Sequence, residues 1–329
     1  MPEEAELNPI SLTVEHVASD SPGEPALLLL QHFGLAEILV QNVMRLVPDT
    51  SRWRLTVTGD MAQTVDAKEG RDASDGYTIE RGAGRAGAKT IRQEDGTFDI
   101  VIADAAFFET HVSLPDDAAV VQHARDAAAH IALHEAGHVV LFDRAEESEQ
   151  YQELPSVEGA AWLWRKHIAV WMDENRIEQL TARMAPNPAR QVDHLPSALE
   201  HLRAEYSEAQ RTQQGDGYAS YSRTCSAAND TFRVLSYLSA ELGLDSDGRP
   251  VRPQPRPDDW DAYVEHSWDE LSGAFHRLRP ADESMSVDEL AAVLETLCVA
   301  MITWMHRCGV DYEFDSATGP SMWWTRDSY

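Results

Sequence analysis

The chain is poor in cysteine and in basic side chains. Its 329 residues include three cysteines, Cys225, Cys298 and Cys308, an odd and small number that excludes a disulfide-stapled scaffold and suits a reducing compartment. Lys and Arg number 27 against 56 Asp and Glu, so the net charge is −29. Because binding to nucleic-acid phosphates requires a basic surface, we expect no nucleic-acid partner.

Long apolar runs are also missing. The most apolar early stretch, ALLLLQHFGLAEILV, is interrupted by Gln31, His32 and Glu37 and is too short to span a bilayer. The first residues, MPEEAELNPISLTVEH, do not have the basic and then apolar pattern of a signal peptide. We therefore expect a cytoplasmic protein with no membrane partner.

The composition that remains is typical of a globular protein, with 43% hydrophobic and 25% charged residues. Alternating apolar residues predict a strand over 53–59, in which Trp53, Leu55 and Val57 share one face. Further strands are predicted over 76–82 and 97–103. Together they indicate a small mixed or antiparallel sheet.

Helical patterns account for most of the remaining chain. Ser113, Pro115 and Asp116 mark the start of a helix that continues to about residue 143. We predict α+β class: a body over residues 1–190 that holds the sheet and two long helices, followed by a mainly helical part over 191–329. The other predicted helices cover 26–46, 157–184, 194–212, 224–243, 259–278 and 286–308.

The strongest chemical signal is HEAGH, inside the alanine-rich helix. His134 and His138 are four residues apart, so a helix presents both imidazoles on one face, where they can bind one metal ion. Glu135 is rotated from that face and can act as a base beside a metal-bound water without being a ligand. This pattern predicts a catalytic zinc site. We expect His130, eight residues before His138, to be packed or to support a ligand rather than to bind the metal itself.

A third ligand is predicted from WMDENRIEQL on the next helix. Glu174 and Glu178 lie on one face of it, and we favour Glu174 as the ligand. Glu178 then orients a histidine or replaces Glu174. The alternatives are His167 as ligand, or two solvated surface acids with Arg176 as a nearby cation.

This combination resembles the gluzincin zinc metallopeptidases, the thermolysin-like group. In that group HExxH is followed, some tens of residues later, by ExxxD or ExxxE on another helix. Here Glu174 follows His138 by 36 positions and Glu178 takes the last place. The string DENRIE is also similar to the ED-x-RIE segment of some intracellular metallopeptidases. The resemblance covers residues 97–184.

The resemblance implies a role for each part of the site. Glu135 would be the general base of peptide hydrolysis, and an edge strand would bind extended substrate, for which TFDIVIADA is our candidate. A downstream Tyr or His would stabilise the oxyanion, and no spacing rule selects among His194, His201, Tyr218, Tyr221 and His266.

We therefore predict a zinc-dependent metallopeptidase with a peptide or protein substrate. One alternative is a zinc hydrolase dedicated to a single regulatory or biosynthetic target. Another is a non-catalytic interaction protein that a metal ion stabilises.

Overall fold

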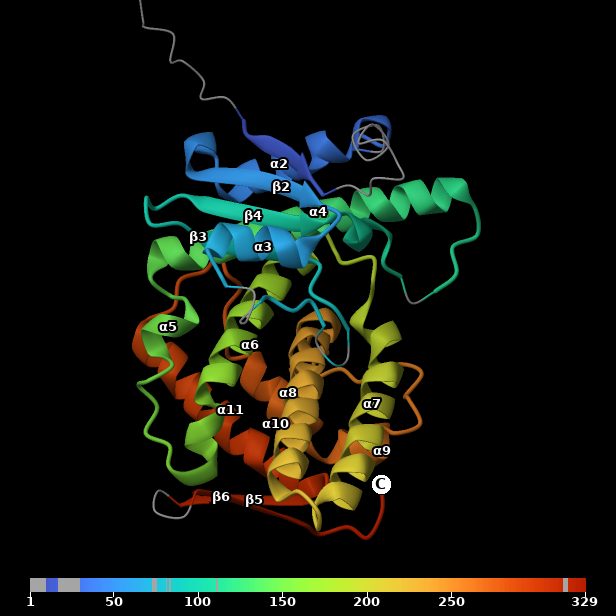
Figure 1. Cartoon of the computed structure of the whole chain (residues 1–329), viewed down its shortest axis with the longest axis vertical. Helices are drawn as coiled ribbons and strands as arrows, with labels where there is room; N and C mark the ends of the chain where they lie inside the picture. Colours follow the sequence, from blue (N-terminus) through green and yellow to red (C-terminus); the bar gives the residue numbers. More distant parts are fainter. Residues whose placement is uncertain are drawn as a thin grey trace, which may run out of the picture. The chain divides into compact units, whose positions relative to one another are not determined.

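Figure 1 shows a computed structural model of the chain, which describes residues 10–16, 30–72, 76–80, 82, 84–110, 112–315 and 319–329. The chain divides into two compact units. The first comprises Met1–Glu80, Arg85–Val140 and Arg183–Ala189. The second comprises Arg81–Gly84, Leu141–Ala182 and Arg190–Tyr329. A small sheet in the first unit and many helices in the second confirm the predicted α+β class.

The sheet of the first unit is mixed. Its strands are β1 (Leu12–Glu15), β2 (Trp53–Thr58), β3 (Ala88–Arg92) and β4 (Phe98–Ala103), in the order β1-β2-β4-β3. β1, β2 and β4 run parallel, and β3 pairs antiparallel with β4. The strands predicted over 53–59 and 97–103 are confirmed, and the alternating Trp53, Leu55 and Val57 are all buried.

The strand predicted to form the substrate-binding edge lies inside the sheet instead. β4 pairs with β2 on one side and with β3 on the other, so the expectation that residues 97–105 form an edge strand is wrong. The cause is a tight turn in which Gln93 N donates to Thr97 O at 2.8 Å, which folds β3 back along β4. Among the described strands the edges are therefore β1 and β3.

The sequence also predicts a strand over 76–82, of which residues 76–80 and 82 are described. These residues form no strand, so the prediction is wrong there, and Glu80 forms only an isolated bridge with Arg85. Tyr77 N donates to the side chain of Asp66 at 2.6 Å. Asp66 belongs to α3 (Met61–Glu69), a helix the sequence patterns did not predict. Met61 and Val65 of α3 pack against Ile91 and Val101, so α3 covers the face of the sheet to which those two side chains point.

Two other helices accompany the sheet (Figure 1). α2 (Leu35–Leu46) begins after Gly34, whose φ is 68°, while part of the helix predicted over 26–46 lies outside the described residues. α4 (Asp117–Arg144) begins later than predicted, because the Asp116 carboxylate accepts from Ala119 N at 2.8 Å and caps the helix in place of Ser113. Short 3₁₀ helices cover Thr50–Arg52 and Asp104–Phe108.

The C-terminal part over 191–329 is mainly helical, as predicted, and belongs to the second unit. The helix predicted over 259–278 is divided at Val264, where φ is −127°. The last residues pair as the strands β5 (Val310–Asp315) and β6 (Gly319–Trp324), which were not predicted. The helices are α5 (Ser148–Tyr151), α6 (Gly159–Met184), α7 (Gln191–Thr212), α8 (Gly217–Leu242), α9 (Trp260–Tyr263), α10 (Glu265–Phe275) and α11 (Val287–Arg307).

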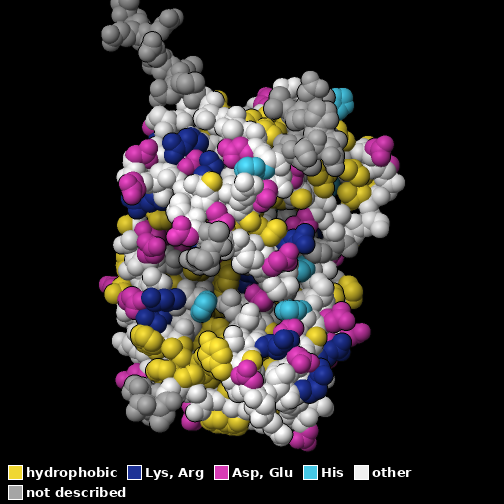
Figure 2. Space-filling view, in the orientation of Figure 1, with side chains coloured by type: hydrophobic (Ala, Val, Ile, Leu, Met, Phe, Trp, Pro, Cys, Tyr) yellow, Lys and Arg dark blue, Asp and Glu magenta, His cyan; other side chains and the backbone are white. Residues whose placement is uncertain are grey.

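The surface is acidic without a single acidic patch on the face shown, where Asp and Glu side chains are scattered among Lys and Arg (Figure 2). Within the described part of the chain, no helix combines the length and the apolar character needed to cross a bilayer.

A buried ion pair crosses the core of the second unit. Arg176 of α6 has no exposed surface and donates to the Glu146 carboxylate at 2.6 Å. The same guanidinium donates to the carbonyl oxygens of Arg279 at 3.0 Å and Glu283 at 2.9 Å. Because Glu146 is also buried, removal of Arg176 would leave its carboxylate inside the protein without an ion-pair partner.

We expect Arg176→Met to lower the free energy of unfolding by about 3–5 kcal/mol, because it leaves the Glu146 carboxylate buried without its cation. The measurement is urea unfolding. Arg211→Met is the matched control, because Arg211 forms an exposed pair with Glu208 that contributes at most about 1 kcal/mol. Equal effects of the two substitutions would contradict the importance of the buried pair.

Candidate metal centre

The helix α4 separates an apolar side from a histidine side. Its alanine-rich sequence favours helix, and Ala132, Leu133, Ala136 and Val139 are fully buried. His134 and His138 remain half-buried, and their ring centroids lie 5.3 Å apart. The structure thus brings the two predicted histidine ligands onto one helix face.

Glu135 points away from that face toward the sheet. Its side chain is buried, with 4% exposure, and its Oε2 accepts a hydrogen bond from the Thr90 hydroxyl at 2.8 Å. The same hydroxyl lies 3.0 Å from the main-chain oxygen of Glu135. Thr90 belongs to the edge strand β3, so the carboxylate is held against the sheet.

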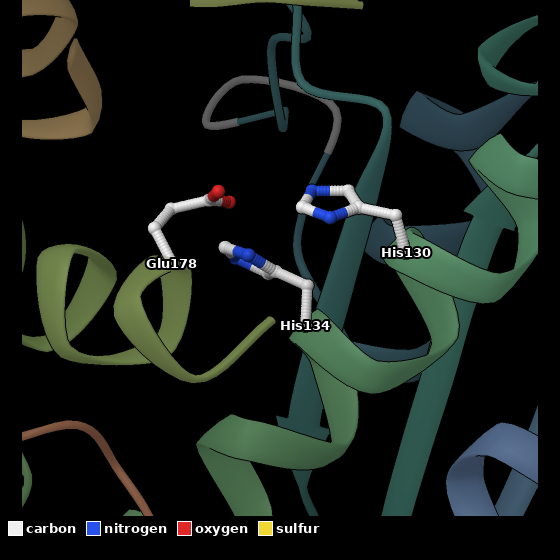
Figure 3. Close-up of side chains that lie close together, drawn as sticks. All are labelled: His130, His134 and Glu178. Atoms are coloured by element: carbon white, nitrogen blue, oxygen red, sulfur yellow. The ribbon is translucent and has the colours of Figure 1, made fainter. Parts of the chain in front are cut away.

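The predicted ligands come from two helices. His134 and His138 belong to the part of α4 in the first unit, whereas Glu174 and Glu178 belong to the part of α6 in the second unit. Figure 3 shows the imidazoles of His130 and His134 on one side of α4 and the carboxylate of Glu178 on α6. Each helix thus carries two predicted ligand residues that are four positions apart on one face.

His130, which we expected to be packed or to support a ligand, has one nitrogen engaged. Its Nδ1 lies 3.1 Å from the carbonyl oxygen of Ala185. If Nδ1 carries the proton, that bond sets the tautomer and leaves Nε2 as the nitrogen that can face a ligand or a carboxylate. His130 is buried, which agrees with a packed or orienting histidine.

Glu174 is oriented by a residue that the sequence patterns did not single out. The Tyr237 hydroxyl of α8 donates to Glu174 Oε2 at 2.6 Å. Burial, and then the negative charge of Glu174, raises the pKa of Tyr237 well above its usual value, so the hydroxyl keeps its proton and remains a donor. A carboxylate held in this way is preorganised to bind a cation.

The interpretation of Glu174 and Glu178 as solvated acids beside Arg176 is wrong in two respects. Glu178 is only 9% exposed, and Arg176 is buried against Glu146. His167, the alternative ligand, is exposed beside Trp164.

The predicted oxyanion donors lie in different surroundings. Tyr218 is 80% exposed, and the Tyr221 hydroxyl is bonded to that of Tyr312 at 2.7 Å. His266 is exposed. His194 and His201 of α7 lie beside two glycines of the 82–84 segment. The choice among the five stays a prediction.

The donor chemistry fits zinc better than the hard cations. Two imidazoles and one carboxylate are typical of catalytic Zn²⁺, whereas Mg²⁺ and Ca²⁺ prefer all-oxygen sets. Compared with family models, with curated proteins and with solved structures, the chain matches none.

Proposed function

We propose that this chain is a zinc-dependent metallopeptidase of the gluzincin type. The observation that carries the proposal is the shared face of His134 and His138 on α4, where the two ring centroids lie 5.3 Å apart. Glu135, next to His134 in sequence and held by Thr90, adds a carboxylate suited to proton transfer.

Each residue of the site has a task in this reaction. His134, His138 and Glu174 would hold the metal, and Glu178 would orient a histidine or take the place of Glu174. Bound Zn²⁺ would supply Lewis acidity, making water acidic enough to react near neutral pH and polarising a carbonyl. Glu135 would accept the proton of the attacking water and pass it to the leaving amine nitrogen. The products would be a carboxylic acid and an amine.

An extended peptide is the substrate that suits the edge strand. β3 pairs with β4 on one side only, and its other edge has no strand partner among the described residues. A peptide added there would gain main-chain hydrogen bonds. Such bonds form with almost any peptide sequence, because they do not involve side chains. The substrate-binding strand proposed here is therefore β3 rather than residues 97–105.

Metal analysis tests the ligand set. We expect about one zinc ion per wild-type chain and its loss in His138→Ala and Glu174→Ala, because each removes a direct ligand. Glu178→Ala is the comparison variant, since it deletes the neighbouring carboxylate on the same helix without removing the favoured ligand, so zinc should be retained with weaker affinity. Zinc kept in Glu174→Ala and lost in Glu178→Ala would assign the ligand role to Glu178. Absence of zinc from the wild type, even after its addition, would refute the proposal.

The Tyr237 hydrogen bond gives a separate prediction. Tyr237→Phe should weaken zinc affinity about 10- to 100-fold, because Glu174 loses the donor that orients it. Competition with a chromogenic chelator measures the affinity. Tyr221→Phe, which removes a hydroxyl bonded to Tyr312, is the control and should leave the affinity unchanged. Equal affinities in wild type and Tyr237→Phe would argue against Glu174 as a ligand.

Catalysis is tested with Glu135→Gln, which keeps the shape of the side chain and removes its basicity. Zinc content should remain and peptide hydrolysis should fall at least about 100-fold. The assay uses a mixture of unrelated peptides with product detection by mass spectrometry. Hydrolysis of very few of them would favour the dedicated peptidase. If wild type hydrolyses none and His134→Ala unfolds the protein, the metal-stabilised interaction protein is the correct alternative.

A further inference from the structure

The edge strand and the proposed base are joined by one side chain. Thr90 Oγ1 lies 2.8 Å from Glu135 Oε2, and neither residue is fully exposed. We infer that Thr90 is the positioning residue of Glu135: its hydroxyl fixes the rotamer of the carboxylate that handles the proton. The inference rests on the proposed function, because it assigns Glu135 the role of base.

The face on which Thr90 lies supports this role. Successive side chains of a strand point to opposite faces of the sheet. Ile91, the next residue, packs with Met61 and Val65 of α3. Thr90 therefore points to the opposite face, toward α4, where its hydroxyl lies within hydrogen-bonding distance of the main-chain oxygen and the carboxylate of Glu135.

Burial makes the hydrogen bond effective. Glu135 is 4% exposed, so little water can replace a lost donor. A hydrogen bond to a charged group in such surroundings contributes more than one between neutral groups. With Oε2 bonded to Thr90, Oε1 is the oxygen that can take the proton of water.

The main chain of Thr90 faces the edge of the sheet that has no strand partner among the described residues. Gln93 N donates to Thr97 O, and Ala103 N donates to Gly87 O at 2.9 Å. Hydrogen-bonded pairs alternate along antiparallel strands, so residues 87, 89, 91 and 93 direct their amides to β4. The N–H and C=O of Thr90 are directed the other way, where an extended substrate would pair. One residue thus contacts the substrate through its main chain and the base through its side chain.

The experiment compares Thr90→Val, which replaces the hydroxyl by a methyl group of similar size, with Thr90→Ser, which restores the hydroxyl. In zinc-loaded protein, Thr90→Val should lower kcat about 10- to 100-fold, as expected when a hydrogen bond to a charged group is removed. KM and zinc content should stay within about twofold, and Thr90→Ser should recover most of kcat. Thr56→Val, a buried threonine of β2, is the control and should retain wild-type kcat.

A second measurement needs no catalysis. In metal-free protein, urea unfolding of Thr90→Val, Glu135→Ala and the double variant gives the coupling between the two side chains. The effect of the double substitution on the unfolding equilibrium constant should differ from the product of the two single effects by a coupling factor of about ten.

The two measurements separate the outcomes. A coupling factor near one would show that the pair does not form and would overturn the inference. Clear coupling with unchanged kcat in Thr90→Val, or with a loss that Thr90→Ser does not recover, would reduce Thr90 to a structural residue and also overturn it. No hydrolysis by zinc-loaded wild type would refute the proposed function and the positioning role together, while the coupling factor would still report on the hydrogen bond.

Discussion

The periodicity of a single helix is the constraint on which the candidate centre depends. Over α4, 3.6 residues per turn bring His134 and His138 to one face and turn Glu135 away from it. The rest of the surface of α4 carries small buried side chains such as those of Ala132 and Ala136. A shift of either histidine by one position would move its imidazole about 100° around the helix and would separate the potential ligands.

Burial of polar groups distinguishes α6 from an ordinary amphipathic helix. Arg176 is inside the protein because Glu146 and two main-chain oxygens accept hydrogen bonds from its guanidinium. Asp173, also buried, accepts from the Tyr151 hydroxyl at 2.7 Å and the Ser148 amide at 2.7 Å, and burial raises its pKa to about 7. Such partners restrict the rotation and tilt of the helix, and they therefore restrict where Glu174 and Glu178 can point.

The candidate centre has a pattern expected of preorganised sites, in which functional side chains are held by other side chains. Thr90 bonds to Glu135, Tyr237 bonds to Glu174, and the Ala185 carbonyl faces the His130 imidazole. Each partner comes from a segment far away in the sequence. Two histidines and a glutamate on one helix can be formed locally, whereas their orientation requires contacts that only a folded chain supplies.

Local sequence patterns are sufficient to predict the α4 and α6 helices, the strands β2 and β4, the shared face of His134 and His138, and the pairing of two glutamates on α6. These follow from hydrophobic periodicity and helix geometry, which act over a few residues. Tertiary structure alone decided that β4 is internal, because a strand acquires its neighbours by folding and not by its own composition. It also decided the partners of Glu135 and Glu174, since Thr90 is 45 and Tyr237 is 63 residues distant from them and no local pattern connects a hydroxyl to a remote carboxylate.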